Sequence, residues 1–204
     1  MLLNFVIVGI FMQISYGIGP FLLPLGIKDK PFKGEFEKVT SKKLPTGEFA
    51  HNTARIKIYR DSNGSVRFEN FEKKNEEDKI YSISIYNHNE QKIYFLDVDS
   101  KIFYAMPAFD SNKESDSKPE SLTYLDKDIG LKTIDNLICR GYQRKQKEND
   151  VLEYWVSEEI DQIIRAKSIF GNEINTLRLF DIKRLKTDSR MFVVPSDYKP
   201  AKIE

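Results

Sequence analysis

Alternation of apolar and polar side chains is the feature of this sequence that most restricts its fold. Residues 54–60 read Ala-Arg-Ile-Lys-Ile-Tyr-Arg, and residues 81–86 place Ile83 and Ile85 two positions apart. A period of two indicates half-buried β-strands, because successive side chains of a strand point to opposite faces of its sheet. The sequence therefore predicts a sheet rather than a bundle of helices.

Turn signals separate the predicted strands at intervals of about ten residues, which is typical of an antiparallel meander. Asn63-Gly64 and Gly171-Asn172 are dipeptides that favour hairpin turns, because both residue types tolerate positive φ. The predicted strands are residues 54–60, 65–69, 81–86, 92–98, 102–106, 137–144, 152–156, 163–170 and 173–184.

Three segments depart from this regular pattern. Within residues 173–184 the alternation changes phase at Phe180, which predicts a β-bulge. Residues 122–131 are compatible with a short helix, and residues 110–120 contain no apolar side chain and predict a flexible loop. Neither half of the chain supplies enough strands for a core of its own, so we expect a single β-rich domain over residues 31–204.

The N-terminus is apolar, with no charged side chain in the first 27 residues. Residues 2–12 form a hydrophobic run of signal-peptide length, and Ser15 and Gly17 are small residues at the −3 and −1 positions of a cleavage site. The sequence therefore predicts a signal peptide over residues 1–17 and an apolar linker over residues 18–30.

An uncleaved membrane anchor that extends to residue 27 is the alternative to a cleaved signal. A segment of 27 residues is long enough to cross a bilayer, which takes roughly 20 residues. Gly19, Pro20 and Pro24 disfavour one continuous spanning helix. Membrane contact is expected only through such an anchor.

No sequence signature of a nucleophile elbow, a phosphate-binding loop, a dinucleotide fold or a zinc protease is present. Two groups of carboxylates stand out, Asp97 with Asp99, and Glu158 and Glu159 with Asp161. Neither has the ligand spacing of a calcium loop, so both are interpreted as solvated turns. We predict no catalytic residue, no metal site and no cofactor.

The histidines and the single cysteine are interpreted as structural residues. His51 and His88 lie in polar stretches without a second ligand at metal-binding spacing and are predicted to be surface histidines. Cys139 lies between Ile138 and Arg140 in a predicted strand and is predicted to be a buried small apolar residue. One cysteine also excludes an intrachain disulfide.

The balance of charge argues against a nucleic-acid partner, because the chain has 32 basic and 31 acidic residues and so lacks a basic surplus. Aromatic residues make up 12% of the chain, and core filling is their default role. A large curved sheet also has a concave apolar side that is able to hold an acyl chain. The candidate ligand-lining residues are Ile56, Ile58, Ile83, Ile85, Phe95 and Trp155.

Three strings together resemble a set of small exported bacterial proteins. They are residues 58–67 (Ile-Tyr-Arg-Asp-Ser-Asn-Gly-Ser-Val-Arg), residues 153–157 (Glu-Tyr-Trp-Val-Ser) and residues 192–198 (Phe-Val-Val-Pro-Ser-Asp-Tyr). Their order and spacing cover most of residues 31–199. This set of proteins resembles in fold the periplasmic outer-membrane lipoprotein-carrier (LolA-like) superfamily. The resemblance implies a large, incompletely closed antiparallel sheet, a half-barrel with few short helices, and lipid carriage.

The leading functional hypothesis is an exported, periplasmic, non-enzymatic protein that binds a hydrophobic ligand in a half-barrel cleft. Its partner would be an acyl chain, a lipid or a lipoprotein. One alternative is a cell-envelope interaction or structural domain without a ligand cavity, and an inner-membrane anchor is the alternative location. A lesser alternative is an enzyme whose carboxylates are dispersed in the sequence and converge in space.

Overall fold

The computed structural model describes residues 26–74, 77–108, 126–147 and 150–201. The proposed signal peptide at 1–17, most of the linker at 18–30 and the loop at 110–120 lie outside these residues. In the described part of the chain no helix is long and apolar enough to span a membrane.

The described residues are mainly β-structure, with one short 3₁₀ helix, η3. The elements are β1 (Phe32–Lys43), β2 (Phe49–Arg60), β3 (Val66–Lys74), β4 (Glu77–Asn87), β5 (Lys92–Asp97), β6 (Ile102–Pro107), β7 (Lys127–Ile134), β8 (Leu137–Lys147), β9 (Asp150–Ser157), β10 (Gln162–Phe170), β11 (Glu173–Lys183), η3 (Ser189–Phe192) and β12 (Lys199–Pro200).

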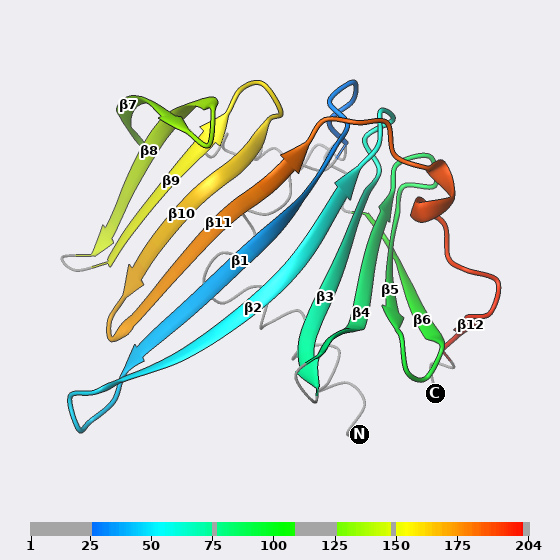
Figure 1. The fold of residues 1–204 in the computed structure, drawn as a ribbon, viewed down its shortest axis with the longest axis horizontal. Helices are drawn as coiled ribbons and strands as arrows, with labels where there is room; N and C mark the ends of the chain where they lie inside the picture. Colours follow the sequence, from blue (N-terminus) through cyan, green and yellow to red (C-terminus); the bar gives the residue numbers. More distant parts are fainter. Residues whose placement is uncertain (1–25, 75–76, 109–125, 148–149, 202–204) are drawn as a thin grey trace, which may run out of the picture. The chain divides into compact units, whose positions relative to one another are not determined.

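Twelve strands of the described chain form one sheet in the order β12-β6-β5-β4-β3-β2-β1-β11-β10-β9-β8-β7 (Figure 1). Two antiparallel meanders, β2 to β6 and β7 to β11, are joined in this order by β1. The two-residue strand β12 pairs in parallel with β6. Because β12 and β7 stand at the two ends of the order, the sheet does not close. The predicted mainly-β class with one large, open antiparallel sheet is confirmed.

The chain divides into two compact units, and strands β1, β2 and β11 contribute residues to both. In unit 1 the described residues are 38–53, 126–147 and 150–178. In unit 2 they are residues 26–37, 54–74, 77–108 and 179–201. The single domain predicted over residues 31–204 therefore stays a prediction.

The core of unit 1 comes from alternate positions of neighbouring strands. Leu152 and Tyr154 of β9 pair across the sheet with Ser168 and Ala166 of β10, and Leu177 of β11 pairs with Ala166. All five residues are buried. The pairing of these three strands thus brings their buried side chains together in one layer of the core.

All nine strands predicted from alternation are present, with ends that shift by at most five residues. Residues 122–131 are compatible with a short helix by sequence, but their described part is not helical, since Lys127–Ile134 is strand β7. A register shift between Asp128 and Gly130 interrupts the period of two, and this explains why alternation did not predict this strand. The first strand, β1, was not predicted as an element.

The predicted irregularity at Phe180 is matched by the backbone of the next residue. Asp181 has φ of 50°, in the left-handed region, so the side-chain alternation of β11 is broken there. The predicted turn at Asn63-Gly64 is also present, with Gly64 at φ of 91°. A Cβ on Gly64 would lie 2.7 Å from the carbonyl carbon of Gly26, so this turn requires glycine for space as well as for φ.

Candidate functional site

The register of β2 to β6 assigns each side chain of unit 2 to one face of the sheet. One row of directly paired residues runs Ile58, Phe68, Ser84, Phe95 and Tyr104. Side chains of directly paired residues lie on the same face. We call this side the Phe95 face. The opposite side carries Ile83, Ile85, Tyr94, Leu96 and Phe103, and we call it the Ile85 face.

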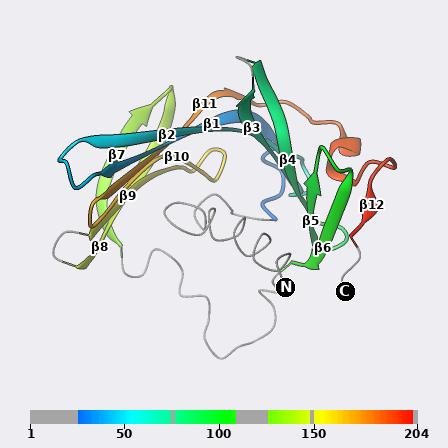
Figure 2. The same cartoon turned by 90° about the horizontal axis from the view of Figure 1, so that it is seen from below.

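The Ile85 face is filled by the C-terminal segment of the same unit. Phe192 of η3 and Tyr198, both under 10% exposed, form one buried cluster with Ile83, Ile85, Tyr94 and Leu96. Figure 2 shows η3 and β12 alongside the strands β4 to β6. This side of the sheet is therefore a packed core made by the chain itself.

Side-chain hydrogen bonds from β3 and β4 fix η3 to the sheet. Arg67 Nη1 of β3 donates to the backbone oxygen of Met191 at 3.1 Å, and Asn87 Nδ2 donates to that of Phe192 at 3.3 Å. Arg67 Nε also donates to Glu69 at 2.9 Å, and the Tyr59 hydroxyl donates to the other Glu69 oxygen. Burial, together with Glu69, raises the pKa of Tyr59 to about 12.

The Phe95 face carries apolar side chains that are only half-buried. Ile58 of β2, Val66 of β3 and Tyr86 of β4 are the buried exceptions. Two polar side chains on this face satisfy each other, since Asn70 Nδ2 donates to Ser82 Oγ at 3.0 Å. The half-buried apolar side chains are Ile56, Phe68, Ile93, Phe95, Ile102, Tyr104 and Met106. This face differs from the packed Ile85 face in retaining accessible apolar surface.

The structure separates the six predicted ligand-lining residues. Ile56, Ile58 and Phe95 share the Phe95 face. Ile83 and Ile85 lie on the opposite, Ile85 face, because their cross-strand partners are Leu96 and Tyr94, which cluster with Phe192. Alternation within each strand does not determine the register between neighbouring strands, and the register decides which residues share a face.

Trp155, the sixth candidate, lies on β9 in unit 1. Its ring occupies the space above Gly141, where an added Cβ would lie 2.7 Å from Trp155 Cζ3. The indole N–H donates to Glu153 at 2.9 Å, and the Lys132 ammonium lies 5.6 Å from the ring centroid. Trp155 is therefore a half-buried aromatic on the β8–β9 surface, fixed by local contacts.

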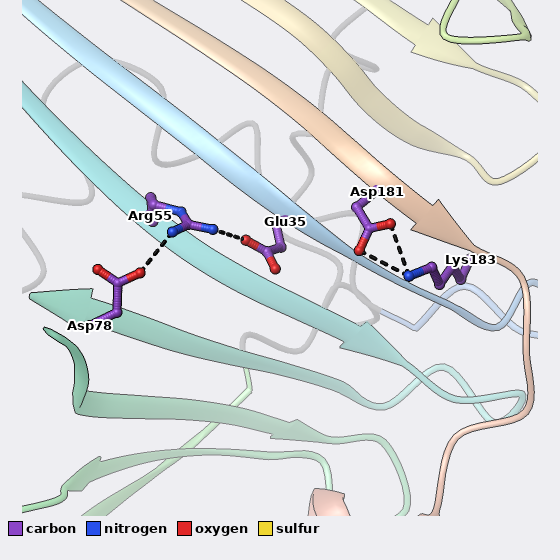
Figure 3. A network of polar contacts seen from close by, with 5 residues as sticks. All are labelled: Glu35, Arg55, Asp78, Asp181 and Lys183. Atoms are coloured by element: carbon purple, nitrogen blue, oxygen red, sulfur yellow. Dashed lines mark hydrogen bonds and ion pairs between the residues drawn. The ribbon is translucent and has the colours of Figure 1, made fainter.

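An exposed ion-pair network lies across β1, β2 and β4 in unit 2 (Figure 3). The Arg55 guanidinium donates to Glu35 at 2.6 Å and to Asp78 at 2.7 Å. Asp181 and Lys183, also drawn in Figure 3, form a separate pair at 3.0 Å. Arg55 is 44% exposed, so this network adds little to stability and offers no buried chemistry.

The two histidines and the cysteine differ in their exposure to solvent. His51 is exposed, as predicted, and hydrogen-bonds Ser41. His88 is half-buried beside the Tyr86 hydroxyl. Cys139 is fully buried, as predicted, and burial raises the pKa of its thiol. A thiol held neutral in this way is a poor nucleophile.

Carboxylates predicted to be turn residues occupy turns. One Asp97 oxygen accepts the backbone N–H groups of Asp99 and Ser100, which closes the β5–β6 turn. Glu158 and Glu159 are exposed between β9 and β10. Among the described residues, no group of three or more histidine, cysteine or acidic side chains is placed to hold a metal ion.

No protein-family model and no curated protein sequence matches this chain. Solved structures do match. An uncharacterized conserved protein from Thermus thermophilus superposes with a TM-score of 0.51 at 9% identity, covering 82% of this chain and 89% of that one. At this identity the likeness concerns the fold alone.

Two further matches have TM-scores below 0.5. A LolA superfamily protein from Nitrosomonas europaea has a TM-score of 0.40 at 10% identity, covering 89% of this chain and 96% of that one. MucB of Pseudomonas aeruginosa, in its complex with MucA, has 0.48 at 9% identity, covering 86% of this chain and 59% of that one. A LolA superfamily protein is therefore among the solved structures to which this chain is similar.

Proposed function

We propose that this chain is an exported, non-enzymatic protein that binds an acyl chain, from a lipid or a lipidated partner, on the Phe95 face of unit 2. Binding would bury methylene groups, each contributing about 0.8 kcal/mol, without a covalent step. The periplasm is the proposed location, reached through the signal peptide at residues 1–17.

The observation that carries this proposal is the contrast between the two faces of β3 to β6. Phe192 and Tyr198 fill one side, whereas Phe68 and Phe95 remain half-buried on the other. Accessible aromatic and aliphatic surface over several adjacent strands is typical of a binding surface for an apolar partner. Ser84, between Phe68 and Phe95 in the row, is small and leaves room beside both rings.

A direct test replaces the two rings and measures binding of a fluorescent long-chain fatty acid to the delipidated chain. The double variant Phe68→Asn/Phe95→Asn should bind at least about tenfold more weakly, because each lost ring contact removes about 1 kcal/mol. Phe49→Asn is the matched control, since Phe49 is a 47% exposed ring in β2 of unit 1. Thermal unfolding of each variant verifies that the fold is retained.

Equal affinity of the double variant and the unchanged chain would refute the acyl-chain site on this face. A second measurement uses protein purified from its own compartment, with lipid extraction and native mass spectrometry. Co-purifying lipid that is lost in the double variant supports the proposal. A chain that carries a protein partner and no lipid would instead favour the interaction-domain alternative.

A further inference from the structure

A compact cationic block lies on β10 and β11 in unit 1. Arg165 pairs directly with Arg178, and two residues further along Lys167 pairs directly with Thr176. The four side chains share one face of the hairpin, because directly paired residues and residues two apart point to the same side. Lys167, Thr176 and Arg178 are exposed, and Arg165 is half-buried.

Two arginines directly opposite each other repel, and this arrangement is destabilising unless an anion compensates it. The described chain supplies one carboxylate, Asp135, from the β7–β8 turn. Its two oxygens lie 3.2 Å from Arg178 Nη2 and 3.8 Å from Arg165 Nη2. Glu153 lies directly opposite Lys167 in the register of β9 and β10 and accepts a hydrogen bond from Trp155. Arg165, Arg178 and Asp135 together therefore carry one net positive charge.

Most donors of the two guanidinium groups remain available. Each group has five N–H donors in a planar fork, and only Arg178 Nη2 is within hydrogen-bonding distance of Asp135. Arg165 Nε has no hydrogen-bond partner in the described structure, but it is buried, so it does not count among the donors that an external ligand can reach. The Asp135 carboxylate thus contacts only part of the two guanidinium groups, and their remaining N–H donors can bind a second oxyanion.

The environment of the block favours a phosphate group over a small monovalent anion. Arginine forks bind phosphate oxygens in pairs, and a phosphate offers three or more oxygens and up to two charges. Lys167 and the Thr176 hydroxyl, next along the hairpin, extend the donor set beyond the forks. Trp155, paired with Arg165, gives the block an apolar flank.

We propose that Arg165 and Arg178, with Lys167 and Thr176, form a binding site for a phosphate-bearing ligand, with Asp135 competing for the same forks. The shared chemistry is the phosphate group, supplied either by a soluble phosphate compound or by an anionic lipid headgroup. This site does not depend on the acyl-chain proposal, so failure of one leaves the other standing.

The experiment titrates the full chain with inorganic phosphate at low ionic strength, following the arginine side-chain signals by NMR. The double variant R165Q/R178Q should lower phosphate affinity about tenfold or more. R55Q is the matched control, because Arg55 has nearly the same exposure, 44% against 43%, and is already held by two carboxylates. R55Q should leave affinity within about twofold.

Removing the competing carboxylate of Asp135 gives a second test, in which phosphate affinity should rise instead of fall. D135N should raise phosphate affinity several-fold, since it frees Arg178 Nη2 and removes a repulsive charge. Asparagine also tolerates the backbone of this position, where φ is 48°. D78N is its control, because it removes an equal charge beside Arg55 and should not change phosphate affinity.

Flotation with phosphatidylglycerol vesicles, against phosphatidylcholine vesicles, identifies the source of the phosphate. Arginine-dependent binding to phosphatidylglycerol assigns the site to a lipid headgroup, and arginine-dependent binding of inorganic phosphate alone assigns it to a soluble compound. The proposal is overturned if R165Q/R178Q and R55Q weaken binding equally. It is also overturned if D135N and D78N have the same effect, or if neither inorganic phosphate nor phosphatidylglycerol vesicles bind.

Discussion

Truncation of Phe192 tests the claim that the C-terminal segment is a structural part of unit 2. The ring is 3% exposed and packs in the cluster of Ile83, Ile85 and Leu96. A phenylalanine buries about 200 Å² of surface, and at about 25 cal/mol per Å² this corresponds to about 5 kcal/mol. Because alanine retains part of that area, Phe192→Ala should destabilise the chain by about 3–5 kcal/mol.

Thermal unfolding followed by far-UV circular dichroism measures this change. For a chain of this size, each kcal/mol lowers Tm by roughly 2–4 °C, so Phe192→Ala should lower it by about 10 °C. Val193→Ala is the matched control, because Val193 is the next residue and is 47% exposed, with an expected loss below about 1 kcal/mol. Equal shifts in the two variants would refute the packing of this segment against the Ile85 face.

Two further predictions concern a turn and the tyrosines. Gly64→Ala should destabilise more than Gly47→Ala by at least about 1 kcal/mol. Both glycines have φ near 90°, but a Cβ at Gly64 would meet Gly26 at 2.7 Å and a Cβ at Gly47 would meet nothing within 4 Å. Equal Tm shifts would contradict the close approach of Gly26. Burial, aided by Glu69 and Glu90, raises the pKa of Tyr59 and of Tyr94 to about 12. Tyrosines of the unfolded chain ionise near pH 10, so the folded chain retains protons that the unfolded chain has lost and stability should fall as pH rises from 10 to 12. Alkaline absorbance titration should show late tyrosine ionisation, reduced by one group in Tyr59→Phe, and a single step near pH 10 would disprove it.

Local sequence patterns were sufficient for most of the fold, because they depend on residues close together in the chain. The alternation in residues 54–60 and 163–170 marked β2 and β10 correctly, and the Asn63-Gly64 dipeptide marked a real turn. Cys139 was correctly predicted to be buried from its apolar strand context. These inferences require only that an apolar side chain is more stable away from water.

Features that depend on backbone irregularity were not predictable in the same way. Strand β7 was missed because Gly130, at φ of 96°, accompanies a register shift that breaks the period of two. The cationic pair of Arg165 and Arg178 was also missed, since the two residues are 13 positions apart and meet only through the β10–β11 pairing. Arginines in separate strands carry no local signal that they will face each other.

The composition of the Phe95 face depends on loop length counted to a single residue. Paired residues of β4 and β5 have numbers that sum to 179, as in Ser84 with Phe95, because four residues join Asn87 to Lys92. An odd sum pairs odd-numbered with even-numbered positions, so Ile83 cannot share a face with Phe95. In contrast, β2 and β3 pair even with even positions, which places Ile58 beside Phe68.

A loop one residue longer or shorter between β4 and β5 would exchange the two faces of β5. Phe95 would then point toward the C-terminal segment, and Leu96 would take its place among the half-buried residues. Alternation alone leaves this choice open, because it is the same for both registers. Variants that test ligand binding must therefore combine Phe68 with Phe95, whereas substitutions at Ile83 or Ile85 report on the packed core.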